Sequence, residues 1–232
     1  MEISPLYFGL VFAVGFLPFI LFYSILKQSE KKKREELEKE AAMRSWACEF
    51  LKDGGVSYRL SGTQGGVAWT IEGRRATGKS SGSVSTKRGA STRWSAKLEE
   101  FPEALILIAP VSASKMPAFG GVGNFLMQYV AASFLGEEAN SIPDMEPVEA
   151  GSAKFREQMT VISNDAEAAQ KFLNEKTESS ILKWRQDYSI NDQPGIILWR
   201  KNLSLRFQKC IWDPIFLESL VSYGTNLVKL EF

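Results

Sequence analysis

The chain has 232 residues, of which 44% are hydrophobic, and its 28 Lys and Arg residues nearly balance its 27 Asp and Glu residues. This balance, and the lack of a recognised binding module, argue against a nucleic-acid-binding protein. The absence of histidine excludes Ser-His-Asp and Cys-His catalytic devices, and also haem, chlorophyll or zinc held by histidine.

The two cysteines, Cys48 and Cys210, are too few and too far apart in the sequence to hold zinc or an iron–sulfur cluster by themselves. They indicate free thiols in a reducing compartment. Carboxylate catalysis stays open, although the adjacent pairs Glu99–Glu100 and Glu137–Glu138 have side chains that diverge on regular structure. We therefore expect no enzymatic activity, no cofactor and no metal.

The amino-terminal segment predicts a transmembrane anchor over residues 1–26. No side chain from Ile3 to Leu26 is charged, and roughly 20 apolar helical residues at about 1.5 Å each cross a bilayer core of ~30 Å. The segment lacks the basic leader and the small-residue cleavage site of a signal peptide, so we expect it to be retained.

The charges that flank this segment predict its orientation. Lys and Arg residues are frequent from Lys27 onward and absent before it, which places the amino terminus outside the cell. We expect a single-pass protein of the inner membrane with a cytoplasmic carboxyl-terminal domain. The basic run would lie on anionic lipid head groups, at about 1 kcal/mol per residue; it consists of Lys31, Lys32, Lys33 and Arg34.

The predicted span also carries two patterns that are typical of helix packing. Gly9 and Ala13 have the small-xxx-small spacing that lets two helices approach closely. Aromatic residues at spacings of three and four form one stripe, made of Phe8, Phe12, Phe16, Phe19 and Tyr23. Two interpretations stay open: the stripe faces lipid, or it packs on a partner helix or an embedded cofactor.

Residues 27–53 predict a juxtamembrane helix, since the segment is rich in Lys, Glu and Ala and ends at two glycines. Residues 56–136 predict a β-rich subdomain. Its expected elements are a hairpin over 56–71, strands over 91–98 and 104–109, a glycine-rich loop over 114–123 and a buried helix over 124–135.

An acidic segment with two prolines predicts a linker over 137–153. Residues 154–232 predict a second α+β subdomain. It is expected to hold a strand over 155–162, helices over 166–173 and 178–188, a hairpin over 195–209 that turns at Lys201–Asn202, and a last helix that begins at Asp213–Pro214. Hairpins outnumber parallel crossovers, so the fold class is α+β.

Residues 73–80 match the phosphate-loop pattern G-x-x-x-x-G-K-[ST]. We expect no nucleotide site there, because the following residues have no apolar stripe and do not predict the helix that the motif requires. The segment is nevertheless basic and free of acids from residue 74 to residue 97. It is expected either to be a solvated loop or to bind lipid head groups or an acidic partner through Arg74, Arg75, Lys79, Lys87 and Arg88.

Together these features favour a non-catalytic, single-pass accessory or scaffold subunit. It would stabilise a larger membrane protein complex, respiratory, photosynthetic, secretory or transport, by packing against integral membrane subunits. The alternative is a membrane-tethered binding or sensing module for a lipid, nucleotide or peptide, acting through the basic segment over 74–97.

Overall fold

A computed structural model describes residues 5–51, 55–79, 86–99, 101, 103–110, 143–188 and 193–230; side chains are described from residue 21 onward, except those of 77–79 and 86–88. The predicted glycine-rich loop and the predicted helix over 124–135 lie outside these residues. The helices are α1 (Pro5–Met43), α3 (Ala153–Arg156), α4 (Ala166–Phe172), α5 (Glu175–Asp187) and α6 (Pro214–Lys229).

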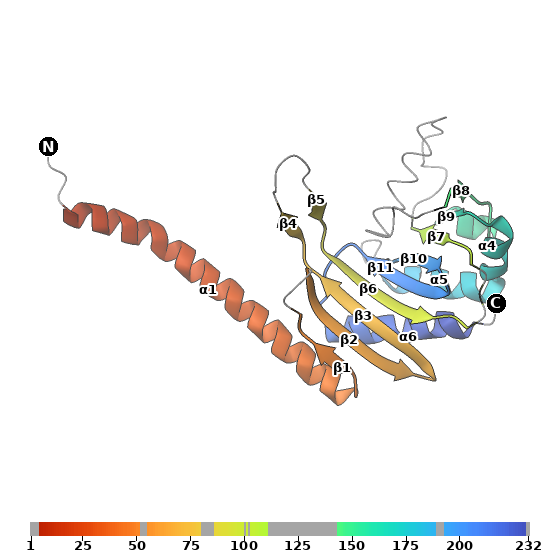
Figure 1. Cartoon of the computed structure of the whole chain (residues 1–232), viewed down its shortest axis with the longest axis horizontal. Coiled ribbons are helices and arrows are strands. Elements are labelled where there is room, and N and C mark those ends of the chain that lie inside the picture. Colours follow the sequence, from red (N-terminus) through yellow and green to blue (C-terminus); the bar gives the residue numbers. More distant parts are fainter. Residues whose placement is uncertain are drawn as a thin grey trace.

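The main sheet has nine strands, and every pair of neighbours is antiparallel (Figure 1). In spatial order the strands are β1 (Ala47–Glu49), β2 (Val56–Gln64), β3 (Val67–Arg74), β6 (Ser91–Lys97), β11 (Asn202–Phe207), β10 (Gly195–Trp199), β7 (Ile106–Ala109), β9 (Thr160–Ser163) and β8 (Glu146–Pro147). A separate ribbon pairs β4 (Thr77–Lys79) with β5 (Thr86–Arg88). The large antiparallel sheet confirms the α+β class.

The apolar face of the sheet is covered by helices. Along one row of the register, Leu60, Ile71, Trp94 and Leu205 are cross-strand neighbours, and each is fully buried. Helix α6 crosses β2, β3, β6 and β11 on this face, and α5 packs beside α6 (Figure 1). Buried side chains of α3, α4, α5 and α6 belong to the same hydrophobic core as this row. The described part of the domain is thus a sheet with one helical layer.

The opposite face of the sheet is polar where β2, β3, β6 and β11 lie side by side. One residue along from the apolar row, Arg59, Glu72, Arg93 and Arg206 are cross-strand neighbours. Successive side chains of a strand point to opposite faces, so these four residues share the second face. Period-two alternation therefore separates the core from a charged surface.

The structure contradicts the predicted membrane anchor. Among the described residues, no helix combines the length and the apolar character that crossing a bilayer requires. The prediction had a transmembrane helix over residues 1–26 that continues into a juxtamembrane helix, and the structure has one helix of 39 residues that runs through the charged run to Met43. The single-pass topology, the inner-membrane location and the transmembrane part of the fold class are therefore corrected.

The predicted helix over 27–53 is also too long at its carboxyl end. Helix α1 ends at Met43, and Ser45 turns the chain with a positive φ of 58°. Residues 47–49 then form strand β1, beside β2. Trp46, Cys48 and Phe50 pack on the core, while Ala47 and Glu49 are exposed. This alternation is a strand pattern that helix-favouring neighbours concealed.

The predicted helix start at Asp213–Pro214 is confirmed. The Asp213 carboxylate accepts a hydrogen bond from the Ile215 N–H, and Pro214 is the first helical residue. The second hairpin is confirmed too, but its turn lies one residue earlier. Arg200 and Lys201 adopt positive φ angles of 49° and 57°, as the two central residues of a tight hairpin turn do.

Helix α6 can approach the sheet closely because residue 224 has no side chain. A Cβ built on Gly224 would lie 2.6 Å from the buried Trp94 ring. We predict that Gly224→Ala lowers the free energy of unfolding by about 1–2 kcal/mol, since overpacking of about 1–3 kcal/mol outweighs a gain of about 1 kcal/mol in helix propensity. Thermal and urea unfolding measure the change.

The control is Gly89→Ala, because nothing lies within 4 Å of a Cβ at Gly89. Its effect should stay within about 0.5 kcal/mol. If Gly224→Ala stabilised the protein, as helix propensity alone predicts, the close contact between α6 and Trp94 would be contradicted.

Candidate functional site

Helix α1 is attached to the domain by its last turns. Leu37 and Ala41 are 0% and 1% exposed and belong to the hydrophobic core. The Arg44 guanidinium forms an ion pair with Glu218 of α6, at 2.8 Å, and another with Glu40 of α1. Apolar burial and ion pairs thus fix the carboxyl end of α1 against α6 and β1.

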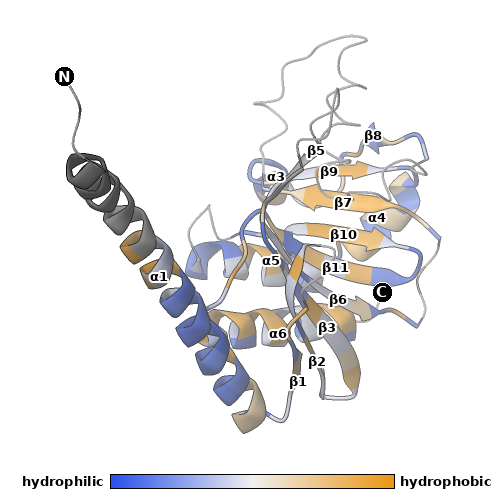
Figure 2. Ribbon diagram, turned by 60° about the vertical axis from the view of Figure 1, so that its left-hand side comes forward, coloured by the Kyte–Doolittle hydropathy of each residue, from blue (hydrophilic) through white to orange (hydrophobic). Residues whose placement is uncertain are grey.

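The other end of α1 projects from the domain (Figure 1). Where its side chains are first described, five large apolar residues are exposed; we call them the apolar ridge. The ridge consists of Leu21 (56%), Phe22 (63%), Tyr23 (68%), Ile25 (63%) and Leu26 (52%). Figure 2 shows this level of α1 as hydrophobic and most of the helix beyond it, toward Met43, as hydrophilic. Grouped exposure of this kind is typical of an interaction surface.

Basic residues from two distant parts of the sequence meet beside α1, at a place we call the junction. Arg75, just after β3, forms an ion pair with Glu30 of α1, and Arg34 pairs with the same carboxylate at 3.1 Å. Lys33 and Arg75 both act electrostatically on the Cys210 thiol, so they lie near it. The junction therefore places two cations on one carboxylate, with Lys33 and Arg75 also near the Cys210 thiol.

The loop that carries Cys210 is held against the sheet by hydrogen bonds. The Tyr58 hydroxyl donates to the Ile211 carbonyl. The Thr92 hydroxyl donates to the Lys209 carbonyl at 2.9 Å and accepts from the Ile211 N–H at 2.8 Å. Because this loop packs Trp212 against the Tyr58 ring, at 4.9 Å between ring centroids, the core of the sheet supports the junction.

Trp212 and Phe50 in turn support two junction cations. The Arg75 guanidinium lies 5.9 Å from the Trp212 ring centroid, and that of Arg34 lies 5.4 Å from the Phe50 ring. Such contacts stabilise a cation by about 0.5–1 kcal/mol at exposed sites. The arginines are thus held at fixed positions, with side chains still partly exposed.

The two thiols are not activated. Burial raises the pKa of Cys48 to about 11, and Glu38 and Glu49 add to the shift. Burial also raises the pKa of Cys210, although Arg75 and Lys33 oppose the shift. A nucleophilic cysteine requires the opposite change, a lowered pKa. The arrangement therefore supports no thiol chemistry at neutral pH.

The phosphate-loop match forms strands rather than a nucleotide site. Gly73 and Arg74 end β3, and Thr77–Lys79 form β4, which pairs with β5. The motif instead requires a helix after the loop, so that backbone N–H groups face the phosphates. In the part of the motif that the structure describes, Thr77–Lys79 thus lie in a strand, where a phosphate loop would lead into a helix.

The structure separates the other predicted site residues. Arg74 lies on the polar face, paired with Glu72 at 3.1 Å, while Arg75 lies at the junction. Lys31 pairs with Glu35 along α1, and Lys32 is exposed. Lys79, Lys87 and Arg88 belong to the β4–β5 ribbon, whose side chains are not described. Of the predicted packing residues, Tyr23 is on the ridge, and Gly9, Ala13, Phe8, Phe12, Phe16 and Phe19 lie in the part of α1 whose side chains are not described.

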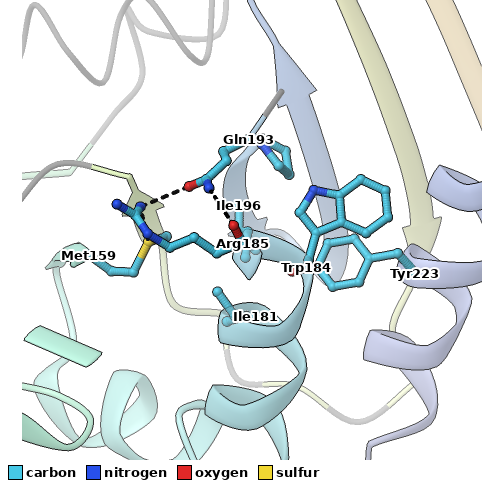
Figure 3. A pocket seen from close by; sticks show the side chains of 8 residues that line it. Met159, Ile181, Trp184, Arg185, Gln193, Ile196 and Tyr223 are labelled. Carbon is cyan, nitrogen blue, oxygen red and sulfur yellow. Dashed lines mark hydrogen bonds between the residues drawn. The ribbon is translucent and has the colours of Figure 1, made fainter. Parts of the chain in front are cut away.

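A small cavity lies between α5, β10 and α6 (Figure 3). Trp184 stacks on Tyr223 at 4.4 Å, and Arg185 donates to the Gln193 side chain at 2.8 Å. The space holds about one water molecule, so it does not admit an organic ligand. Among the described residues, no group of His, Cys, Asp and Glu could hold a metal ion.

Comparison with known proteins identifies no family. No family model matches the chain, and no curated protein matches it. Among solved structures, the crystal structure of the mycobacterial trehalose monomycolate transport factor A, TtfA, is similar, with 7% identity and a TM-score of 0.47 over 85% of this chain and 90% of that chain. A similarity at this level supports no functional argument.

The attachment of α1 should depend mainly on apolar burial. We predict that Leu37→Ala lowers the free energy of unfolding by about 2–5 kcal/mol, because it removes a buried side chain. Glu30→Gln should cost less than about 1 kcal/mol, because its partners are partly exposed. It should still raise hydrogen exchange over residues 28–36. Equal destabilisation by Leu37→Ala and Glu30→Gln would contradict the claim that apolar burial contributes more than the ion pairs.

The Cys48 thiol should be slow to react. In a Cys210→Ser background at pH 8, we predict that alkylation of native protein is roughly 100-fold slower than in urea, because a pKa of about 11 rather than 9.0 lowers the thiolate fraction by that factor. The midpoint of the alkylation rate against pH should lie near pH 11. If steric shielding alone slowed the reaction, this midpoint would stay near pH 9. The pKa of Cys48 is higher in the folded protein than in the unfolded protein. The stability that the protonated thiol contributes should therefore be complete below about pH 9 and be lost as the pH rises to about 11.

Proposed function

We infer that this protein is a non-catalytic accessory subunit that joins a larger protein assembly through the apolar ridge of α1. The observation that carries the proposal is the position of the ridge. Side chains that are 52–68% exposed lie on a helix whose last turns are fixed in the core. A helix that is anchored at one end and apolar at the other presents its ridge at low entropic cost to a partner.

The ridge supplies part of the free energy that docking requires, and further contacts with the partner must supply the rest. Full burial of one large apolar side chain contributes about 1.5–3 kcal/mol, so the five half-exposed residues supply on the order of 6 kcal/mol before the cost of association. Lys27, Lys31 and Lys32 follow the ridge directly and are exposed. A matching partner therefore offers an apolar helix or groove with acidic groups at its edge.

Integral membrane protein subunits are the partner class that we propose. The parts of such subunits that lie outside the bilayer also present apolar helices and grooves, and burial of the uncharged ridge against one of them requires no insertion into lipid. In this arrangement the domain contributes binding and support to the complex, and the raised pKa values of Cys48 and Cys210 support a role without thiol chemistry.

Site-directed photo-crosslinking tests this function. A photoreactive residue at Phe22 should yield one cross-linked product of defined mass after gentle extraction, and Ile25→Arg should abolish it. Ile215→Arg is the matched control, because Ile215 is 71% exposed on α6 and Ile25 is 63% exposed on α1. Migration of the extracted protein as a lone monomer, or equal effects of the two arginine variants, would refute the proposal.

A further inference from the structure

The side of α1 that points away from the domain carries a regular row of exposed residues, which we call the outer face. Leu37 and Ala41 mark the opposite side of the helix, because both are buried against the domain. Figure 2 shows α1 along the outer edge of the domain. Successive members of the outer face are three or four residues apart, so they share one side of the helix. They are Ile25, Ser29, Lys32, Glu36, Lys39 and Met43, and all six are exposed.

The outer face is nearly symmetric about Arg34. Lys32 and Glu36, a base and an acid, lie two residues before and two residues after it. Ile25 and Met43, 63% and 62% exposed, lie nine residues before and nine residues after it. In an antiparallel pair of identical helices, a twofold axis brings residues at equal distances from the centre opposite each other. The row is therefore complementary to itself when it is reversed.

We propose that a second copy of this chain binds antiparallel along the outer face, with the twofold axis at the level of Arg34. Lys32 of each copy then lies opposite Glu36 of the other, and Ile25 lies opposite Met43. Lys39 meets the uncharged Ser29. A parallel pair would instead place Lys32 against Lys32 and Glu36 against Glu36, which like charges oppose. The charges of the outer face thus favour the antiparallel orientation.

The position of the outer face leaves room for this arrangement. Because it points away from Leu37 and Ala41, the two domains lie on opposite sides of the helix pair and do not block it. At 1.5 Å per residue, the row from Ile25 to Met43 is about 27 Å long, and a helix is about 10 Å wide. The contact is therefore smaller than a standard interface of about 800 Å² per partner, and we expect weak, salt-dependent pairing.

Sedimentation velocity of the purified full-length chain, over a range of concentrations, tests the proposal. The wild-type protein should form dimers that dissociate on dilution and in about 0.5 M salt, where screening shortens the range of the ion pairs. Lys32→Glu and Glu36→Lys should each weaken dimerisation at least about tenfold, because each variant turns two attractive contacts between the copies into two repulsive ones.

An equimolar mixture of the two variants gives the sharpest result. One variant carries acids at both central positions and the other carries bases at both, so the mixture should pair within about threefold of wild-type affinity. Each variant keeps like charges along its own helix, so contacts between the copies must account for the recovery.

The matched control is Lys27→Glu, which reverses an exposed charge on the same helix. Lys27 lies seven residues before Arg34, on the side that faces the domain, and its reversal should change affinity less than about twofold. Three outcomes would overturn the proposal: a monomer at every concentration, equal effects of Lys27→Glu and Lys32→Glu, or a mixture that pairs no better than its components.

This pairing is independent of the accessory function, because it is measured on the purified chain without any partner. A crosslink from Phe22 to a second copy would be recognised by its mass, twice that of the chain. Distances within one copy are measured in high salt and at low concentration, where the pair is dissociated.

Discussion

Burial of Leu37 and Ala41 in the hydrophobic core is the contact on which the rest of the account depends. It fixes the carboxyl end of α1 to the domain, so the direction in which the helix projects is set by the sheet and α6. The ion pairs of Arg44 and Arg75 add to this contact, but their groups are partly exposed and each contributes less than about 1 kcal/mol. The position of the apolar ridge therefore follows from hydrophobic packing several turns away.

The two faces of the sheet differ in their physical roles. One face buries a continuous apolar row under α6, and the absence of a side chain at Gly224 allows that helix to lie directly on Trp94. The other face carries arginines, hydroxyl groups and Glu72 in matching register. Because both faces belong to the same strands, a rigid core supports the charged surface. The ridge on α1 and the polar face of the sheet are thus separate surfaces of one protein.

The sequence predicted those elements whose signals are local. Period-two alternation gave the first hairpin, and the capping pair Asp213–Pro214 gave the start of α6. It did not predict β1, because Trp46, Cys48 and Phe50 alternate inside a segment rich in helix formers and become a strand only beside β2. The Glu30–Arg75 ion pair was equally out of reach, since no local pattern links residues so far apart. The basic residues predicted to act together are divided between the junction, the polar face and the β4–β5 ribbon. Charge could be counted from the sequence, but its placement depends on the fold.

A distance distribution between spin labels tests the central claim, that α1 holds its ridge rigidly on the domain, most directly. Labels at Ser24 and Lys183, both exposed, would be introduced with Cys48 and Cys210 replaced by serine, and the distance measured by double electron–electron resonance. The account predicts one narrow distribution for the protein alone. A broad or multiple distribution would show that the projecting part of α1 moves independently of the domain, and would contradict it.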